Sequence, residues 1–278
     1  MNEAEKAESD LQRVYRARTS KLEKALESEG IIIVDSSVLG LSEGHMRKTP
    51  IHLCREFDLG FIRWWMDSVP DNVFYTGEVV EEMEGILNKV DIDSRECEKI
   101  SLRKNLNNLK KQEFIEKARD YNELALQWIE LIKFMSDRRV ERVFPDIIAE
   151  DIVENPLYCE IELLAETKGV MESRAYRYGS GKKKKHPYND ALIFFKAVLL
   201  ATHTNRTTIL TRDSDFTKIS KAYFEKLRGN FRLPKPYHDL DVLISHRNGL
   251  SLYSNGNGER KILNEEEYTL EDSIKLSY

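Results

Sequence analysis

The segment Ile31-Ile32-Ile33-Val34-Asp35 constrains the fold more than any other part of the sequence. Its four consecutive β-branched apolar residues favour a short strand. Because no polar residue alternates with them, both faces of that strand are expected to be buried, which is typical of a parallel sheet covered by helices. The segment therefore predicts an α/β fold in which Asp35 ends a central strand.

Short apolar segments and longer periodic segments alternate along the rest of the chain, a pattern that indicates an α/β fold. Further strands are predicted at residues 73–75, 140–144, 207–211 and 241–244. Helices are predicted at about 51–67, 78–89, 147–167 and 191–201. Pro156 should break the helix in which it lies. The expected architecture is a three-layer sandwich with a mostly parallel central sheet, and function is expected at the carboxyl ends of the strands.

Three regions are expected to be additions to the α/β core. Residues 1–30 are predicted to form an N-terminal amphipathic helix that stops at Gly30. Residues 91–137 are charged and periodic, which predicts two long helices, arranged as a hairpin and inserted into a core domain of residues 31–245. Residues 246–278 are expected to be a C-terminal tail, either weakly ordered or a hairpin.

Composition excludes several classes of protein. With 41% hydrophobic and 33% charged residues, the chain matches a globular protein with a highly charged surface. No apolar run approaches the roughly 20 residues of a membrane span, and the acidic N-terminus does not resemble a secretory signal. Three scattered cysteines, Cys54, Cys97 and Cys159, argue against a disulfide framework and against structural zinc. A reducing cytoplasm is the expected location.

The formal net charge of −5 counts against nucleic-acid binding, although segregated patches matter more than the total. Basic residues form two groups and acidic residues one. These groups are Lys182, Lys183, Lys184 and Lys185; Arg138, Arg139 and Arg142; and Glu78, Glu81, Glu82 and Glu84. The lysine group lies in a glycine-rich segment, where it forms either a solvated loop or a loop that grips phosphate.

Single acids in this sequence are ambiguous. Asp35 at a strand end could be a turn or helix-capping residue, and so could Asp213 and Asp215. Glu82 and Glu84 flank the same apolar stripe, so periodicity does not choose between them. Asp190 is more suggestive, because it opens an almost entirely apolar helix whose dipole would stabilise an anion there.

The order of the acids carries more information than any one of them. A strand ends in Asp, a helix carries Glu, a helix begins with Asp, and a strand precedes Asp-x-Asp-Phe. The segments are Ile33-Val34-Asp35-Ser36-Ser37-Val38-Leu39, Thr76-Gly77-Glu78-Val79-Val80-Glu81-Glu82-Met83, Asn189-Asp190-Ala191-Leu192-Ile193 and Leu210-Thr211-Arg212-Asp213-Ser214-Asp215-Phe216. This order resembles that of the PIN-domain nucleases. The resemblance covers about residues 31–90 and 140–220.

The resemblance implies a set of acids around one or two divalent ions, together with two hydroxyls near them. The core acids and metal ligands would be Asp35, Glu82, Asp190 and Asp213. Asp215 would be an accessory catalytic acid, and Ser37 and Thr211 match the hydroxyl positions. The choice of Glu82 follows from the family's Val-x-x-Glu-Leu pattern, with Glu81 as the remaining alternative.

Hydrolysis of a phosphodiester suits such a site, because several carboxylates close together repel one another and Mg²⁺ or Mn²⁺ relieves that repulsion. One metal ion could activate a water molecule, and a second could stabilise the leaving oxygen. Asp35 and Asp213 are expected to share a metal ion, with Glu82 and Asp190 completing the shell.

Other functions remain open. A phosphatase of the haloacid dehalogenase type would need an acid where Ser37 stands. A non-catalytic PIN-like scaffold or RNA-binding module and a toxin of a toxin–antitoxin pair are also candidates. RNA is the expected partner rather than DNA, and a protein partner at residues 91–137 and a homodimer are further candidates. The sequence does not distinguish endonuclease from exonuclease action.

Overall fold

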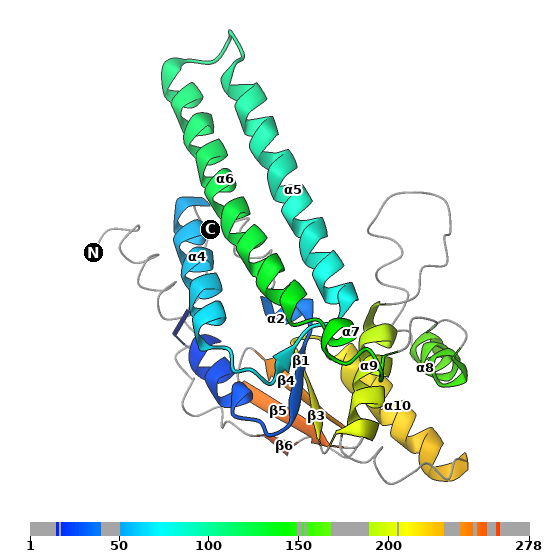
Figure 1. The fold of residues 1–278 in the computed structure, drawn as a ribbon. Coiled ribbons are helices and arrows are strands. Elements are labelled where there is room, and N and C mark those ends of the chain that lie inside the picture. Colours follow the sequence, from blue (N-terminus) through cyan, green and yellow to red (C-terminus); the bar gives the residue numbers. More distant parts are fainter. Residues whose placement is uncertain are drawn as a thin grey trace.

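The computed structural model describes residues 15–16, 18–39, 51–148, 152, 155–167, 189–204, 206–230, 240–246, 249–254 and 260–261. A six-stranded sheet crosses the body of the molecule in the order β2-β1-β3-β4-β5-β6 (Figure 1). The strands are β1 (Ile31–Val34), β2 (Val73–Phe74), β3 (Thr207–Thr211), β4 (Leu240–His246), β5 (Gly249–Ser254) and β6 (Arg260–Lys261).

The four strands β2, β1, β3 and β4 are mutually parallel, while β5 and β6 continue the sheet antiparallel. Every residue of β1 and β3 is buried. The apolar, β-branched sequence of β1 correctly predicted this, because the helices that connect parallel strands cover both faces of the sheet. The mixed α/β class and the mostly parallel sheet are confirmed.

The sheet has a topological switch point between β1 and β3. From β1 the chain passes outward to β2 on one side, and the later strands β3 and β4 extend the sheet on the other side. In open α/β sheets, connections at such a point leave a crevice at the carboxyl ends of the strands, and ligands bind there. Asp35 directly follows β1, and Asp213 follows β3 by two residues.

Helices pack around this sheet and fill most of the connections. They are α2 (Ser36–Leu39), α4 (Ile51–Ser68), α5 (Gly77–Ser101), α6 (Asn108–Asp137), α7 (Val140–Val143), α8 (Pro156–Thr167), α9 (Asn189–His203) and α10 (Asp215–Asn230). Both α9 and α10 pack on the sheet, α8 packs on both of them, and α4 packs on α6. Of the described helices, none is both long and apolar enough for a bilayer crossing.

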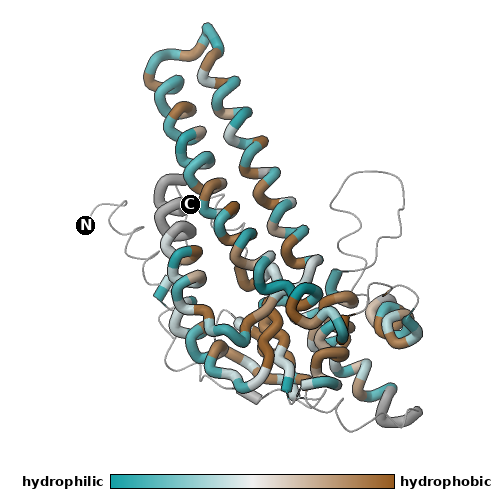
Figure 2. The backbone as a smooth tube through the Cα atoms, viewed as in Figure 1, coloured by the Kyte–Doolittle hydropathy of each residue, from teal (hydrophilic) through white to brown (hydrophobic). Residues whose placement is uncertain are grey.

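The predicted helical hairpin is present, but its first helix begins earlier than predicted. A single helix, α5, runs from Gly77 through Ser101, so the helix predicted at 78–89 and the start of the 91–137 region are one element. The α5–α6 hairpin projects from the body, and its outer half is mostly hydrophilic (Figures 1 and 2). At the turn, the side chain of Asn107 caps α6 by accepting a hydrogen bond from the Lys110 N–H at 2.8 Å.

The prediction of a strand at 140–144 was wrong, because Val140–Val143 forms the short helix α7. Only Arg139 is extended, in an isolated parallel bridge with Tyr75. The Phe144 N–H then bonds to the Val140 carbonyl at 2.8 Å, which closes a helical turn. The β-branched residues suggested a strand, but their spacing of three to four residues suits a helix equally well.

The remaining boundaries agree in part with the sequence. Residues 18–26 are helical, and Gly30 follows with φ of +82°, where an added Cβ would lie 2.3 Å from the Arg206 carbonyl oxygen. Pro156 starts α8. Beyond residue 246, β5 pairs with β4 as an antiparallel hairpin, which agrees with the hairpin alternative for the tail.

Candidate functional site

The carboxyl ends of β1 and β3 are joined by hydrogen bonds to Asp35. This side chain is almost fully buried, with 1% of its surface exposed. Its Oδ2 accepts hydrogen bonds from the Thr211 hydroxyl at 2.8 Å and from the Ser37 hydroxyl. The Asp213 N–H in turn donates to Thr211 Oγ1 at 2.9 Å. Thr211 therefore connects the acid after β1 to the acid after β3.

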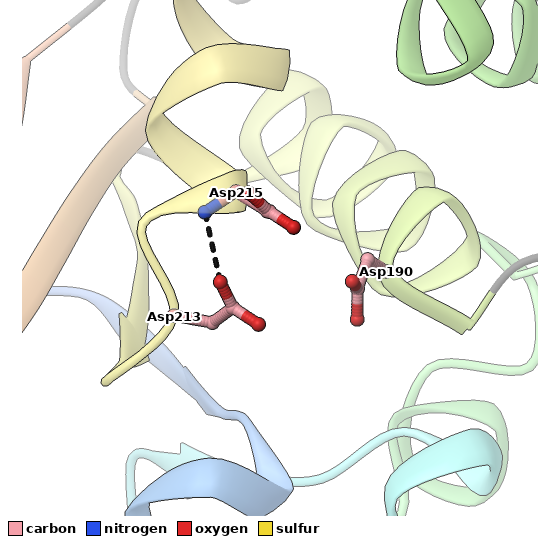
Figure 3. Close-up of side chains that lie close together, drawn as sticks. All are labelled: Asp190, Asp213 and Asp215. Atoms are coloured by element: carbon pink, nitrogen blue, oxygen red, sulfur yellow. Dashed lines mark hydrogen bonds between the residues drawn. The ribbon is translucent and has the colours of Figure 1, made fainter. Parts of the chain in front are cut away.

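Three acids form what we term the acidic cluster: Asp190, Asp213 and Asp215 (Figure 3). One carboxylate oxygen from each lies within 4.8 Å of the others. Asp190 is buried in the first turn of α9, whereas Asp213 and Asp215 are half-buried. Residues separated by more than 20 positions in the chain thus converge in front of the same sheet edge.

Local backbone chemistry holds Asp213 and Asp215 in place. Asp213 Oδ1 accepts a hydrogen bond from the Asp215 N–H at 2.9 Å, which satisfies a free N–H at the start of α10. Asp215 Oδ1 accepts one from Lys218 Nζ at 2.6 Å. This hydrogen bond and the charge of Asp215 raise the pKa of the Lys218 ammonium, and the charge of Asp213 adds to the effect. Asp215, predicted as an accessory, is a full member of the acidic cluster.

Glu82 links the two sides of the site. Its carboxylate accepts a hydrogen bond from Asn189 Nδ2 at 2.7 Å, directly beside Asp190 in the chain, and another from the Ser36 hydroxyl, directly beside Asp35. Glu81 is exposed to solvent. The structure therefore directs Glu82, not Glu81, toward the other acids.

Asp35 and Glu82 are adjacent to the acidic cluster without belonging to it. Thr211 Oγ1 bonds both Asp35 Oδ2 and the main-chain N–H of Asp213, and the sharing of one metal ion by Asp35 and Asp213 stays a prediction. The most compact group of carboxylate oxygens instead contains Asp190, Asp213 and Asp215. Asp35 is held in position by the Ser37 and Thr211 hydroxyls.

The three carboxylates of the acidic cluster repel one another, and Lys218 offsets part of that repulsion at Asp215. At 4.8 Å, two unit charges repel by about 3 kcal/mol at an effective dielectric constant of about 20, before solvent screens the half-buried pair. All the candidate ligand atoms are carboxylate oxygens, the donors that Mg²⁺ and Mn²⁺ prefer. The residues therefore fit a hard divalent cation.

The sequence analysis did not predict a buried ion cluster formed by Glu78, Glu141 and Lys196, in which Glu78 lies one helical turn before Glu82 on α5. Lys196 of α9 is 2% exposed. Its Nζ donates to both carboxylate oxygens of Glu78, at 2.6 and 2.7 Å, and to Glu141 Oε1 at 2.6 Å. The same Glu141 oxygen accepts from the Gly77 N–H at 2.9 Å, at the start of α5. These bonds attach the start of α5 to α7 and α9.

The ion cluster and the Glu82 contact are two attachments between the same pair of helices. Glu78 and Glu82 are one turn apart on α5, and Asn189 and Lys196 are two turns apart on α9. Each pair shares a helix face, so the α5 face meets the α9 face at two polar contacts. A single lysine within an otherwise apolar helix was the available signal, because a buried ammonium needs acidic partners.

The basic residues predicted to bind substrate can be placed only in part. Lys182, Lys183, Lys184 and Lys185 lie outside the described residues. Ser37 and Thr211, the predicted hydroxyl positions, both contact Asp35. Arg212 lies between Thr211 and Asp213, is exposed, and its N–H donates to Ser37 Oγ at 2.9 Å.

No protein-family model, curated protein or solved structure matches this chain. The resemblance to the PIN-domain nucleases consequently stays a prediction from the four sequence motifs.

Proposed function

We propose that the chain is a metal-dependent nuclease with a PIN-like three-layer sandwich, and that it hydrolyses phosphodiester bonds of RNA rather than DNA. One observation carries the proposal: Asp190, Asp213 and Asp215 converge within 4.8 Å at the switch point of a mostly parallel sheet. Asp35 and Glu82 flank them, which completes the five acids of the resemblance. The choice of RNA follows from the resemblance, since RNA is the commoner substrate of PIN-domain nucleases, and the choice of a reducing cytoplasm follows from the three scattered cysteines.

The chemistry divides between a cation and the side chains. Mg²⁺ or Mn²⁺, when bound, would act as a Lewis acid. It would lower the pKa of the attacking water and offset the negative charge of the leaving oxygen. Asp190, Asp213 and Asp215 would hold it. Asp35, which is buried, orients the Ser37 and Thr211 hydroxyls, and the half-buried Glu82 can accept a proton from an attacking water.

Cleavage assays test the proposal directly. The chain should be incubated with labelled single-stranded RNA, single-stranded DNA and structured forms of each, with Mn²⁺ or with EDTA. We expect fragments from single-stranded RNA with Mn²⁺ and none with EDTA. Intact substrates in every Mn²⁺ reaction would contradict a nuclease, and equal cleavage of DNA would contradict the preference for RNA.

Mn²⁺ should also stabilise the folded chain, because a ligand that binds only the native state adds free energy by mass action. At about 100 times its Kd this gain is about 2.7 kcal/mol, which corresponds to a rise in Tm of roughly 5–10 °C. Thermal unfolding followed by circular dichroism measures it. The matched control is the double variant Asp190→Asn/Asp213→Asn, in which the rise should disappear.

This titration separates the nuclease from a non-catalytic PIN-like scaffold. A scaffold has no physical need to hold three carboxylates within 4.8 Å of one another. An unchanged Tm of the wild-type chain across the Mn²⁺ range would favour the scaffold.

A further inference from the structure

Charge is segregated along the α5–α6 hairpin. Residues 99–112, here termed the hairpin tip, contain five cations and no acid: Lys99, Arg103, Lys104, Lys110 and Lys111. By contrast, residues 77–98 contain eight acids and two cations, and residues 113–137 contain six acids and three cations. A positive tip is therefore carried on a strongly negative pair of helices, in a chain whose net charge is −5.

The cations of the hairpin tip are available to a ligand. Lys99, Arg103, Lys104 and Lys110 are exposed, and Lys111 is half-buried. Two leucines beside them, Leu102 and Leu109, are 80% and 83% exposed. The tip lies at the end of the hairpin far from the sheet (Figure 1). An exposed surface of this kind, with apolar side chains among cations, is typical of a surface that binds a partner.

Two acids of the hairpin form ion pairs within their own helices. Glu113 pairs with Lys117 at 2.7 Å, and Asp91 pairs with Arg95 at 2.6 Å. The turn is also ordered, since Asn107 caps α6 and the Arg103 N–H bonds to the Ile100 carbonyl at 3.0 Å. Among the described residues, no other stretch of this length carries five cations without an acid.

We infer that the hairpin tip is a second nucleic-acid site, which binds the phosphate backbone of the same strand whose other part enters the acidic cluster. This inference rests on the proposed function. Five acids at the cluster repel a polyanion, so productive binding requires cations at a distance from the chemistry. An acidic protein could also bind the cations of the hairpin tip. A polyanionic substrate, however, explains both the cations of the tip and the metal-binding acids of the acidic cluster.

The length of α5 sets the size of the ligand. From Glu82 to Ser101 the helix rises about 28 Å, at about 1.5 Å per residue. A strand that is stacked as in a duplex advances about 3.4 Å along its axis per phosphate, so that distance corresponds to about eight stacked nucleotides. A strand much shorter than this reaches only one of the two sites, whereas a longer strand reaches both.

The test compares two quadruple variants of the full chain. The tip variant is Arg103→Gln/Lys104→Gln/Lys110→Gln/Lys111→Gln, and the matched control removes four lysines elsewhere, Lys24→Gln/Lys133→Gln/Lys221→Gln/Lys226→Gln. Fluorescence anisotropy in EDTA measures binding of labelled single-stranded RNAs of 5 and 20 nucleotides, and circular dichroism checks the fold. The tip variant should bind the 20-mer about a hundredfold more weakly at about 0.05 M salt. Its slope of log K against log salt should fall by about 3, while 5-mer binding and the control stay near wild type.

Each alternative outcome has one meaning. Wild-type affinity and salt slope of the tip variant for the 20-mer would overturn the inference, and so would an equal loss in the control. Cleavage of the 5-mer with Mn²⁺ tests the acidic cluster alone, because that RNA does not span to the tip. If binding depends on the tip but neither RNA is cleaved, the proposed nuclease activity is refuted and the hairpin tip as a nucleic-acid site is supported. Absence of RNA binding by the wild-type chain would overturn both.

Discussion

Asp213→Asn should lower Mn²⁺-dependent cleavage by more than about a hundredfold without disturbing the fold. Even partners one step removed from a metal ion cost about ten- to a hundredfold when changed, and Asp213 offers an oxygen directly to the acidic cluster. Asparagine keeps the oxygen that accepts from the Asp215 N–H at 2.9 Å, so the start of α10 stays capped. The loss is therefore chemical rather than structural.

The control for this variant is Asp71→Asn. Asp71 is an exposed acid that pairs with Arg138 at 3.1 Å and lies outside the acidic cluster. Initial rates of RNA cleavage and thermal melts should be measured for both variants beside the wild type. Near-wild-type cleavage by Asp213→Asn, at an unchanged Tm, would rule out its role as a metal ligand.

Lys196→Met should destabilise the chain by about 3–5 kcal/mol, because it leaves two partly buried carboxylates without their cation. Lys196 is 3% exposed at its side chain, against 14% for Glu78 and 23% for Glu141. Burial acts to raise the pKa of Glu141, but the charge of Lys196, its hydrogen bond and the Gly77 N–H outweigh burial and lower that pKa. Urea unfolding at pH 7 measures the loss.

Two further measurements show whether the carboxylates left without Lys196 cause this loss of stability. The triple variant Lys196→Met/Glu78→Gln/Glu141→Gln should recover most of the stability, since it removes the charges together. A lowered Glu141 pKa stabilises the wild type above the unfolded pKa of about 4.3, and this contribution is lost as the pH falls through the folded pKa. The deficit of Lys196→Met should therefore shrink in acid. A deficit that is independent of pH and persists in the triple variant would indicate lost packing instead.

The sequence predicted the parts of the fold that are set locally. A run of four buried residues in β1, the apolar helix α9 and the strand β3 all appear as expected, because their burial is encoded in consecutive side chains. The acids at the carboxyl ends of β1 and β3 could be placed at one sheet edge, because parallel neighbours present those ends together.

Other features depend on contacts that the sequence does not encode locally. The place of Asp215 in the acidic cluster depends on the turn after β3, where its N–H donates to Asp213 Oδ1. The link from Asp35 to that turn depends on the Thr211 hydroxyl. The ion cluster needs Glu78, Glu141 and Lys196 from three helices. The sequence around residue 90 does not show whether α5 ends there or continues, because the residues before and after that position are equally rich in charge.

The position of β1 within the sheet also governs how the chain can be made. Ile33 pairs with Ile209, about 180 residues further along. At ribosomal rates of about 5–20 residues per second, β1 waits roughly 10–35 s for its second neighbour. During that time an apolar strand with one open edge is exposed to other nascent chains, and open edges of this kind promote aggregation. Chaperone supply during translation should therefore govern the yield of native protein more than the stability of the finished fold does.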